Sequence, residues 1–108
     1  MNDTIEALRQ QLREQANVRF PAAARGGGYP IRFNHCFLRV VYDNVCGAPW
    51  RQALPGSGPA LERLSEEQLR QALALGEDII ADPDRCRELN RRSLAYRGKL
   101  RPPAPPHP

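Results

Sequence analysis

The sequence predicts an all-α protein, a small four-helix cluster with a buried central helix. Apolar residues recur at helical spacing in four segments, capping residues flank these segments, and stretches rich in proline and glycine separate them. With 108 residues, of which 41% are hydrophobic and 26% charged, the chain has the length and composition of one ordinary globular domain. We expect a single helical domain over residues 1–100 and a proline-rich tail over residues 101–108.

The first helix is expected over residues 2–17, where Ile5, Leu8 and Leu12 form a single apolar stripe. Residues 21–30, PAAARGGGYP, should be a loop, because two prolines bracket three consecutive glycines. The helix is amphipathic, so its apolar stripe should lie against the rest of the domain.

Residues 34–46, NHCFLRVVYDNVC, are expected to form the central helix. Asn34 fits the N-cap position and Gly47 the left-handed C-cap position. Apolar residues cover most of the helical circumference, which is typical of a buried helix: Phe37, Leu38, Val40, Val41, Tyr42 and Val45. The β-branched valines leave a strand as the alternative, but the apolar positions do not alternate.

Residues 47–60, GAPWRQALPGSGPA, should form a long connection, because three prolines forbid a continuous helix. Trp50 is expected to pack back against the core, since a large aromatic side chain is rarely left in solvent.

Two further helices are expected, one over 64–81 and one from Pro83 to about Tyr96. A capping box, Ser65-Glu-Glu-Gln68, begins the first of them, and Asp82 caps the second. Gly76 costs about 1 kcal/mol inside a helix, so we expect a neighbouring element to pack closely there. The sequence RPPAPPHP, from residue 101 on, has no core-forming residue and is expected to be a disordered tail.

The charge pattern concentrates cations near the C-terminus. The net charge is +4, and seven of the sixteen cations lie between Arg85 and Arg101, Arg91 and Arg92 among them. Guanidinium groups bind phosphate, so an Arg-rich last helix could contact a protein or nucleic acid partner. The alternative is that these cations complement the helix dipole or reflect the base composition of the genome.

We do not expect this protein to associate with a membrane. No segment approaches ~20 apolar residues, and the N-terminus has no signal pattern, so we expect a cytoplasmic protein. A chain this short is often a homodimer, and a homodimer that completes the buried helix stays a hypothesis.

The candidate site lies on the central helix. His35, Arg39 and Asp43 recur at i, i+4 and i+8, so they form one polar stripe in an apolar helix. We expect Arg39 and Asp43 to pair and His35 to titrate near neutral pH. Asn44 lies beside the stripe. The functional interpretation is a proton-handling or anion-binding site. The alternative is a satisfied buried network or the solvent-facing edge of the helix.

The three cysteines do not form a predicted site. Cys36 and Cys46 stand about 15 Å apart on one helix, too far for a disulfide. With Cys86 they lack metal-ligand spacing. We therefore expect no metal site and interpret the thiols as buried and inert.

Three blocks of the sequence resemble a group of small bacterial proteins that are often loosely labelled GNAT-type N-acetyltransferases. The blocks run from His35 to Asn44, from Gly47 to Trp50 and from Leu89 to Lys99. The resemblance covers about two-thirds of the chain and implies acetyl-CoA as a candidate ligand. It also draws attention to the polar and aromatic members of the blocks: His35, Arg39, Tyr42, Asp43, Asn44, Trp50, Asn90 and Arg97.

Two function hypotheses follow. The first is a small helical interaction module that contacts a macromolecular partner through the Arg-rich last helix, with no cofactor. The second is a small-ligand-binding protein or enzyme, acetyl-CoA-linked by the resemblance, built on the stripe of His35, Arg39 and Asp43. Candidate catalytic residues are His35, Tyr42 and Asp43. Candidate binding residues are Arg39, Asn44, Trp50, Arg91, Arg92 and Arg97.

Overall fold

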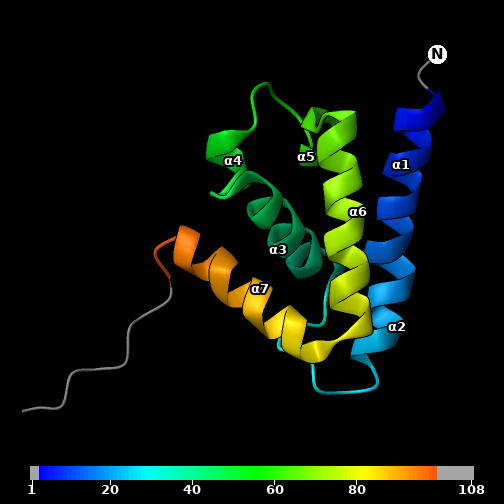
Figure 1. Cartoon of the computed structure of the whole chain (residues 1–108), viewed down its shortest axis with the longest axis vertical. Coiled ribbons are helices and arrows are strands. Elements are labelled where there is room, and N and C mark those ends of the chain that lie inside the picture. Colours follow the sequence, from blue (N-terminus) through cyan, green and yellow to red (C-terminus); the bar gives the residue numbers. More distant parts are fainter. Residues whose placement is uncertain (1–2, 100–108) are drawn as a thin grey trace, which may run out of the picture.

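Helices make up most of residues 3–99, the part of the chain that the computed structural model describes, and this part contains no strand (Figure 1). The elements in chain order are α1 (Asp3–Glu14), the π-helical turn η1 (Gln15–Arg19), α2 (Phe20–Ala24), α3 (Asn34–Cys46), α4 (Trp50–Ala53), α5 (Ala60–Arg63), α6 (Glu66–Ala81) and α7 (Pro83–Tyr96). The all-α prediction is confirmed, and the strand alternative for 34–46 is wrong. The predicted tail, 101–108, lies outside the described residues.

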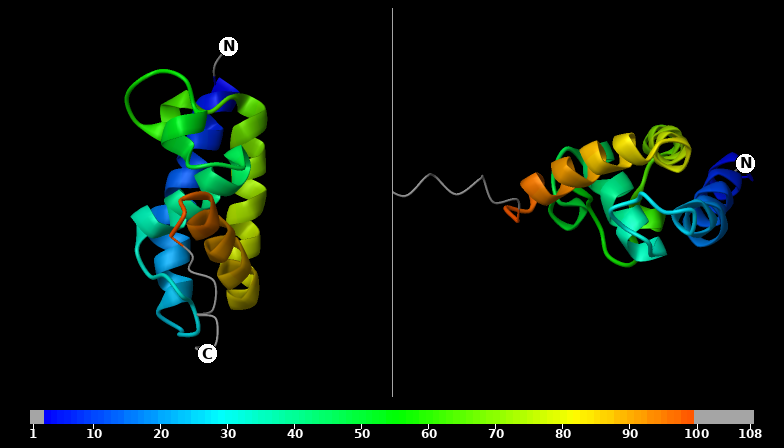
Figure 2. Two further views of the ribbon diagram at one scale, coloured as in Figure 1. Left: turned by 90° about the vertical axis from the view of Figure 1, so that its left-hand side faces the viewer. Right: turned by 90° about the horizontal axis from the view of Figure 1, so that it is seen from below.

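The central position of α3 organises the fold. α1 and α6 lie side by side and run in the same direction, and α3 and α7 lie on the other side of α6 (Figures 1 and 2). α3 packs against α6, α7 and η1 at once. Phe37, Val40 and Val41 are fully buried, and Tyr42 and Asp43 are buried beside them. The prediction of a buried central helix is therefore confirmed.

The N-terminal helix is longer than the sequence predicts. It continues past residue 17 through η1 and α2 and ends at Ala24, so the predicted loop over 21–30 begins only at residue 25. Pro21 lies in the first turn of α2, where proline is tolerated because its missing N–H group has no role in the helix. The turn η1 separates α1 from α2, so Pro21 lies near the start of a new α-helical segment and not in the interior of one.

The π-helical turn places a polar side chain against α6. Gln15 is 3% exposed, and its Nε2 donates to the Leu73 carbonyl oxygen at 3.0 Å and to Glu77 Oε2 at 2.8 Å. Gly76 provides the space for this amide: a Cβ atom there would stand 2.1 Å from Gln15 Oε1 and 3.1 Å from Phe37 Cζ. The close packing predicted for Gly76 is confirmed.

Gly76→Ala is expected to lower the free energy of unfolding by about 1–2 kcal/mol. The gain in helix propensity is about 1 kcal/mol, but overpacking costs about 1–3 kcal/mol, and the Gln15 amide must leave its two hydrogen bonds. Urea unfolding measures the change. In a Gln15→Ala background the same substitution should cost clearly less, and an equal cost there would contradict the contact.

The helix caps agree with those predicted from the sequence, except that the N-cap of α3 lies one residue earlier. The Ser65–Gln68 capping box, the Asp82 cap and the left-handed Gly47 are all present. The N-cap of α3 is Phe33, not Asn34 as predicted. The Asn34 side chain instead accepts from the His35 N–H at 2.8 Å and donates to Asn17 at 2.8 Å, so it ties the start of α3 to η1.

The predicted connection over 47–60 contains a helical turn of its own. α4 begins at Trp50, directly after Pro49, and α5 begins at Ala60. Prolines 49 and 59 stop a continuous helix as predicted, but each also precedes a short helix as its N-cap residue. Trp50 is half-buried, and its ring meets the Tyr42 ring edge-on with centroids 6.2 Å apart.

Candidate functional site

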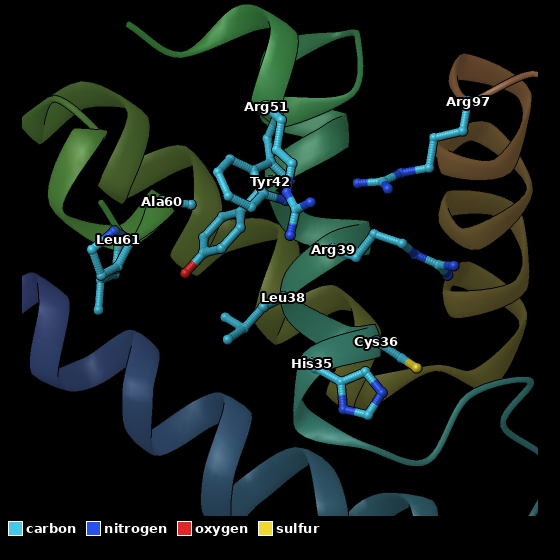
Figure 3. Close-up of a pocket in the computed structure, with 11 residues that line it drawn as sticks. His35, Cys36, Leu38, Arg39, Tyr42, Arg51, Ala60, Leu61 and Arg97 are labelled. Carbon is cyan, nitrogen blue, oxygen red and sulfur yellow. The ribbon is translucent and has the colours of Figure 1, made fainter. Parts of the chain in front are cut away.

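One face of α3 borders a pocket of about 630 Å³ that is open to solvent (Figure 3). α3 supplies one wall, α4 and α5 supply a second wall, and the end of α7 closes the third side. The lining residues are His35, Cys36, Leu38, Arg39, Tyr42, Trp50, Arg51, Pro59, Ala60, Leu61 and Arg97. A volume of ~300–1,000 Å³ is usual for a small-molecule site, so the pocket has the size of a ligand site.

Asp43 joins three of the elements that border the pocket. Its carboxylate is fully buried and accepts hydrogen bonds from Arg97 Nε at 2.6 Å, Arg97 Nη2 at 3.1 Å, Ser93 Oγ at 2.7 Å and the Trp50 N–H at 3.0 Å. One side chain therefore connects α3 to the start of α4 and to the end of α7. The hydrogen bond to Asp43 raises the pKa of Arg97, so this cation is permanent.

The predicted ion pair between Arg39 and Asp43 is wrong. Arg39 instead donates through Nη2 to Asn90 Oδ1 on α7, and Asp43 pairs with Arg97. Side chains one turn apart on an exposed helix often pair, but α7 packs against α3 and offers each of these two side chains a hydrogen-bond partner. Arg39 reaches toward α7 and Arg97 reaches back toward α3 (Figure 3).

Three guanidinium groups at or beside the pocket have no carboxylate partner. Within residues 3–99, no acidic side chain forms an ion pair with Arg39, Arg51 or Arg63. The Arg51 and Arg63 guanidinium carbons lie 5.2 and 5.4 Å from the centre of the Trp50 ring, and the Nε atoms of Arg39 and Arg63 are buried with no hydrogen-bond partner in the described part of the chain. None of the lining residues is acidic. The pocket therefore has a positive potential.

The three candidate catalytic residues, His35, Tyr42 and Asp43, have different surroundings. Burial raises the pKa of Tyr42 to about 12, so its phenol stays protonated at neutral pH and cannot act as a base. The Asp43 carboxylate already accepts hydrogen bonds from Ser93 and Arg97, and it does not line the pocket. His35 is exposed, with its ring stacked on Phe33 at 5.6 Å.

The structure brings together five of the predicted site residues: His35, Arg39, Tyr42, Trp50 and Arg97. Asn44 does not line the pocket. Its Nδ2 donates to the Val40 and Leu89 carbonyl oxygens at 2.7 and 2.9 Å, which joins α3 to α7. Sequence reasoning missed Arg51, Leu38 and Leu61 as lining residues. Arg51 could have been suspected, because it directly follows Trp50, which was predicted to pack against the core. The sequence contained no indication that α5 would line a pocket.

The thiols differ in burial. Cys86 is fully buried, as predicted, and burial raises its pKa to about 11. The prediction of buried thiols is wrong for Cys36 and Cys46, which are half-buried at the two ends of α3. Cys36 also lines the pocket. Burial also raises the pKa of Cys46, which leaves it a poor nucleophile at neutral pH.

The cations of α7 are largely compensated. Arg85 pairs with Glu88 at 2.7 Å, Arg92 pairs with the same carboxylate at 2.7 Å, and Arg87 pairs with Asp84. Arg91 and Arg92 are exposed and do not line the pocket. These ion pairs reduce the positive field that a phosphate backbone would meet. Contact with a macromolecule through α7, and a homodimer, stay predictions.

Comparison of the chain with protein-family models, curated proteins and solved structures finds no match. None of the helices within residues 3–99 has both the length and the hydropathy to cross a bilayer.

Proposed function

We propose that this protein binds a small anionic molecule in the pocket bordered by α3, α4, α5 and α7. The observation that supports it is the set of guanidinium groups without a carboxylate partner, Arg39 and Arg51 in the pocket and Arg63 beside it. Like charges held close together repel each other, and an anion bound among them removes that cost.

The pocket favours binding over catalysis. The two residues best placed for chemistry by sequence, Tyr42 and Asp43, are a protonated phenol and a carboxylate saturated with donors. An acyl-CoA thioester carries phosphate groups and is therefore one candidate among anionic ligands, as the resemblance of the sequence also implies. We propose no acetyl transfer.

The chain's only tryptophan reports on binding directly. Trp50 lines the pocket and is half-buried, so a ligand among the arginines should change its emission. Titration with inorganic phosphate, acetate, octanoate and acetyl-CoA should give a saturable change with at least one of them. A charged hydrogen bond contributes about 1.5–3 kcal/mol, so Arg39→Gln should weaken that binding by about tenfold to a hundredfold.

The matched control is Arg91→Gln, which removes an exposed arginine outside the pocket and should leave the affinity unchanged. Circular dichroism confirms that both variants are folded. If no anion changes the emission at millimolar concentration, or if the two variants bind equally, the proposed function is wrong.

A further inference from the structure

The pocket has two chemically different ends. Arg39 and Arg97 lie at the end next to α7, and Leu38, Tyr42, Ala60 and Leu61 lie at the end next to α5 (Figure 3). Arg51 lies above Tyr42, between the two ends (Figure 3). An inorganic anion would fill only the cationic end and leave the apolar end in water.

The charge balance limits the ligand to a low negative charge. The charge of Arg97 is compensated by Asp43 through two hydrogen bonds. Of the lining cations, Arg39 and Arg51 are the two with no carboxylate partner within residues 3–99. Arg39 already uses Nη2 for Asn90. Arg63, the third guanidinium without a carboxylate partner, lies against Trp50 and does not line the pocket. A group with one or two negative charges matches the two lining cations.

We infer that the ligand is a monocarboxylate with an aliphatic or aromatic body, with the carboxylate at Arg39 and Arg51 and the apolar body against Leu38 and Leu61. This inference rests on the proposed function, because it names the ligand class of the same pocket. The apolar body follows from the end next to α5, where Leu38, Ala60 and Leu61 line the pocket beside the phenol of Tyr42. These apolar side chains gain from the burial of methylene groups and not from a second charge.

A homologous series of carboxylates tests the inference. Acetate, butyrate, hexanoate and octanoate carry the same charge and differ only in chain length. Burial of each methylene group should tighten binding about fourfold, which is the fold-change expected for one CH₂ removed from water. The dissociation constant from Trp50 emission should therefore fall steadily along the series.

Variants locate the two ends. Leu61→Ala should flatten the dependence on chain length, and Arg39→Gln should weaken every member of the series by a similar factor. Leu73→Ala is the apolar control, because Leu73 is half-buried on α6 and does not line this pocket. 1-Octanol, which has the chain without the charge, should bind at least tenfold more weakly than octanoate.

The outcomes separate the two proposals. If phosphate or acetyl-CoA binds in an Arg39-dependent way while chain length has no effect, the carboxylate inference is wrong and the proposed function stands. If octanoate and 1-octanol bind equally, the anionic end is not used, and the inference is again wrong. If no anion binds, both proposals are wrong.

Discussion

Asp43→Ala is expected to lower the free energy of unfolding by about 3–5 kcal/mol, the cost of removing one partner from a buried ion pair. The carboxylate is fully buried and accepts four hydrogen bonds from three residues, Arg97, Ser93 and the Trp50 N–H. Its removal leaves these donors without an acceptor and takes away the hydrogen bonds that join the start of α4 and the end of α7 to α3. Domains are typically stable by ~5–15 kcal/mol, so the loss takes a large part of the total.

A double-mutant cycle with Arg97→Ala measures the ion pair itself. The two single substitutions should cost clearly more in sum than the double variant, because each one leaves the other charge uncompensated. Ser93→Ala should cost less than either, since it removes one neutral donor. Urea unfolding of the four proteins gives the energies. A cost below ~1 kcal/mol for Asp43→Ala, the value of an exposed pair, would show that the carboxylate does not hold the three helices together.

Phe37→Ala is expected to cost about 3–5 kcal/mol, as large-to-small substitutions of buried aromatic residues do. Phe37 is fully buried on the side of α3 that faces η1, α2 and α6. Its ring lies 4.9 Å from that of Phe20, and its Cζ is 3.1 Å from the position of a Cβ at Gly76. The cavity left behind cannot close without moving α6.

Phe33→Ala is the matched control, because Phe33 is 62% exposed and lies four residues earlier in the sequence. Its removal should change the free energy of unfolding by no more than about 0.5 kcal/mol. Thermal unfolding followed by circular dichroism compares both variants with the parent protein. Equal costs at the two positions would contradict the placement of α3 at the centre of the core.

The long helices were predictable because their signals are local. Gly47 in the left-handed conformation, the Ser65–Gln68 capping box and the Asp82 cap each involve residues within one turn. The end of the N-terminal helix was not predictable, because a π-helical turn carries no propensity signal and Pro21 is usually read as a stop. Tertiary packing of Gln15 against Gly76 accompanies that turn.

The candidate site was predictable in part. Spacing along one helix was enough to place His35 and Arg39 on the same face, and both line the pocket. The same spacing gave the wrong partner for Arg39, because Asn90 and Arg97 come from a helix about fifty residues later in the sequence. Spacing along one helix contains no information about such distant contacts. The apolar wall from α5 was missed for the same reason.

The separation of Asp43 from its partners also has a consequence for the order of synthesis. Ser93 and Arg97 follow Asp43 by 50 and 54 residues. A nascent chain that contains α3 but not yet the end of α7 therefore lacks the Ser93 and Arg97 donors to the Asp43 carboxylate. The hydrogen bonds that bury the Asp43 carboxylate therefore form only after the end of α7 has joined the fold.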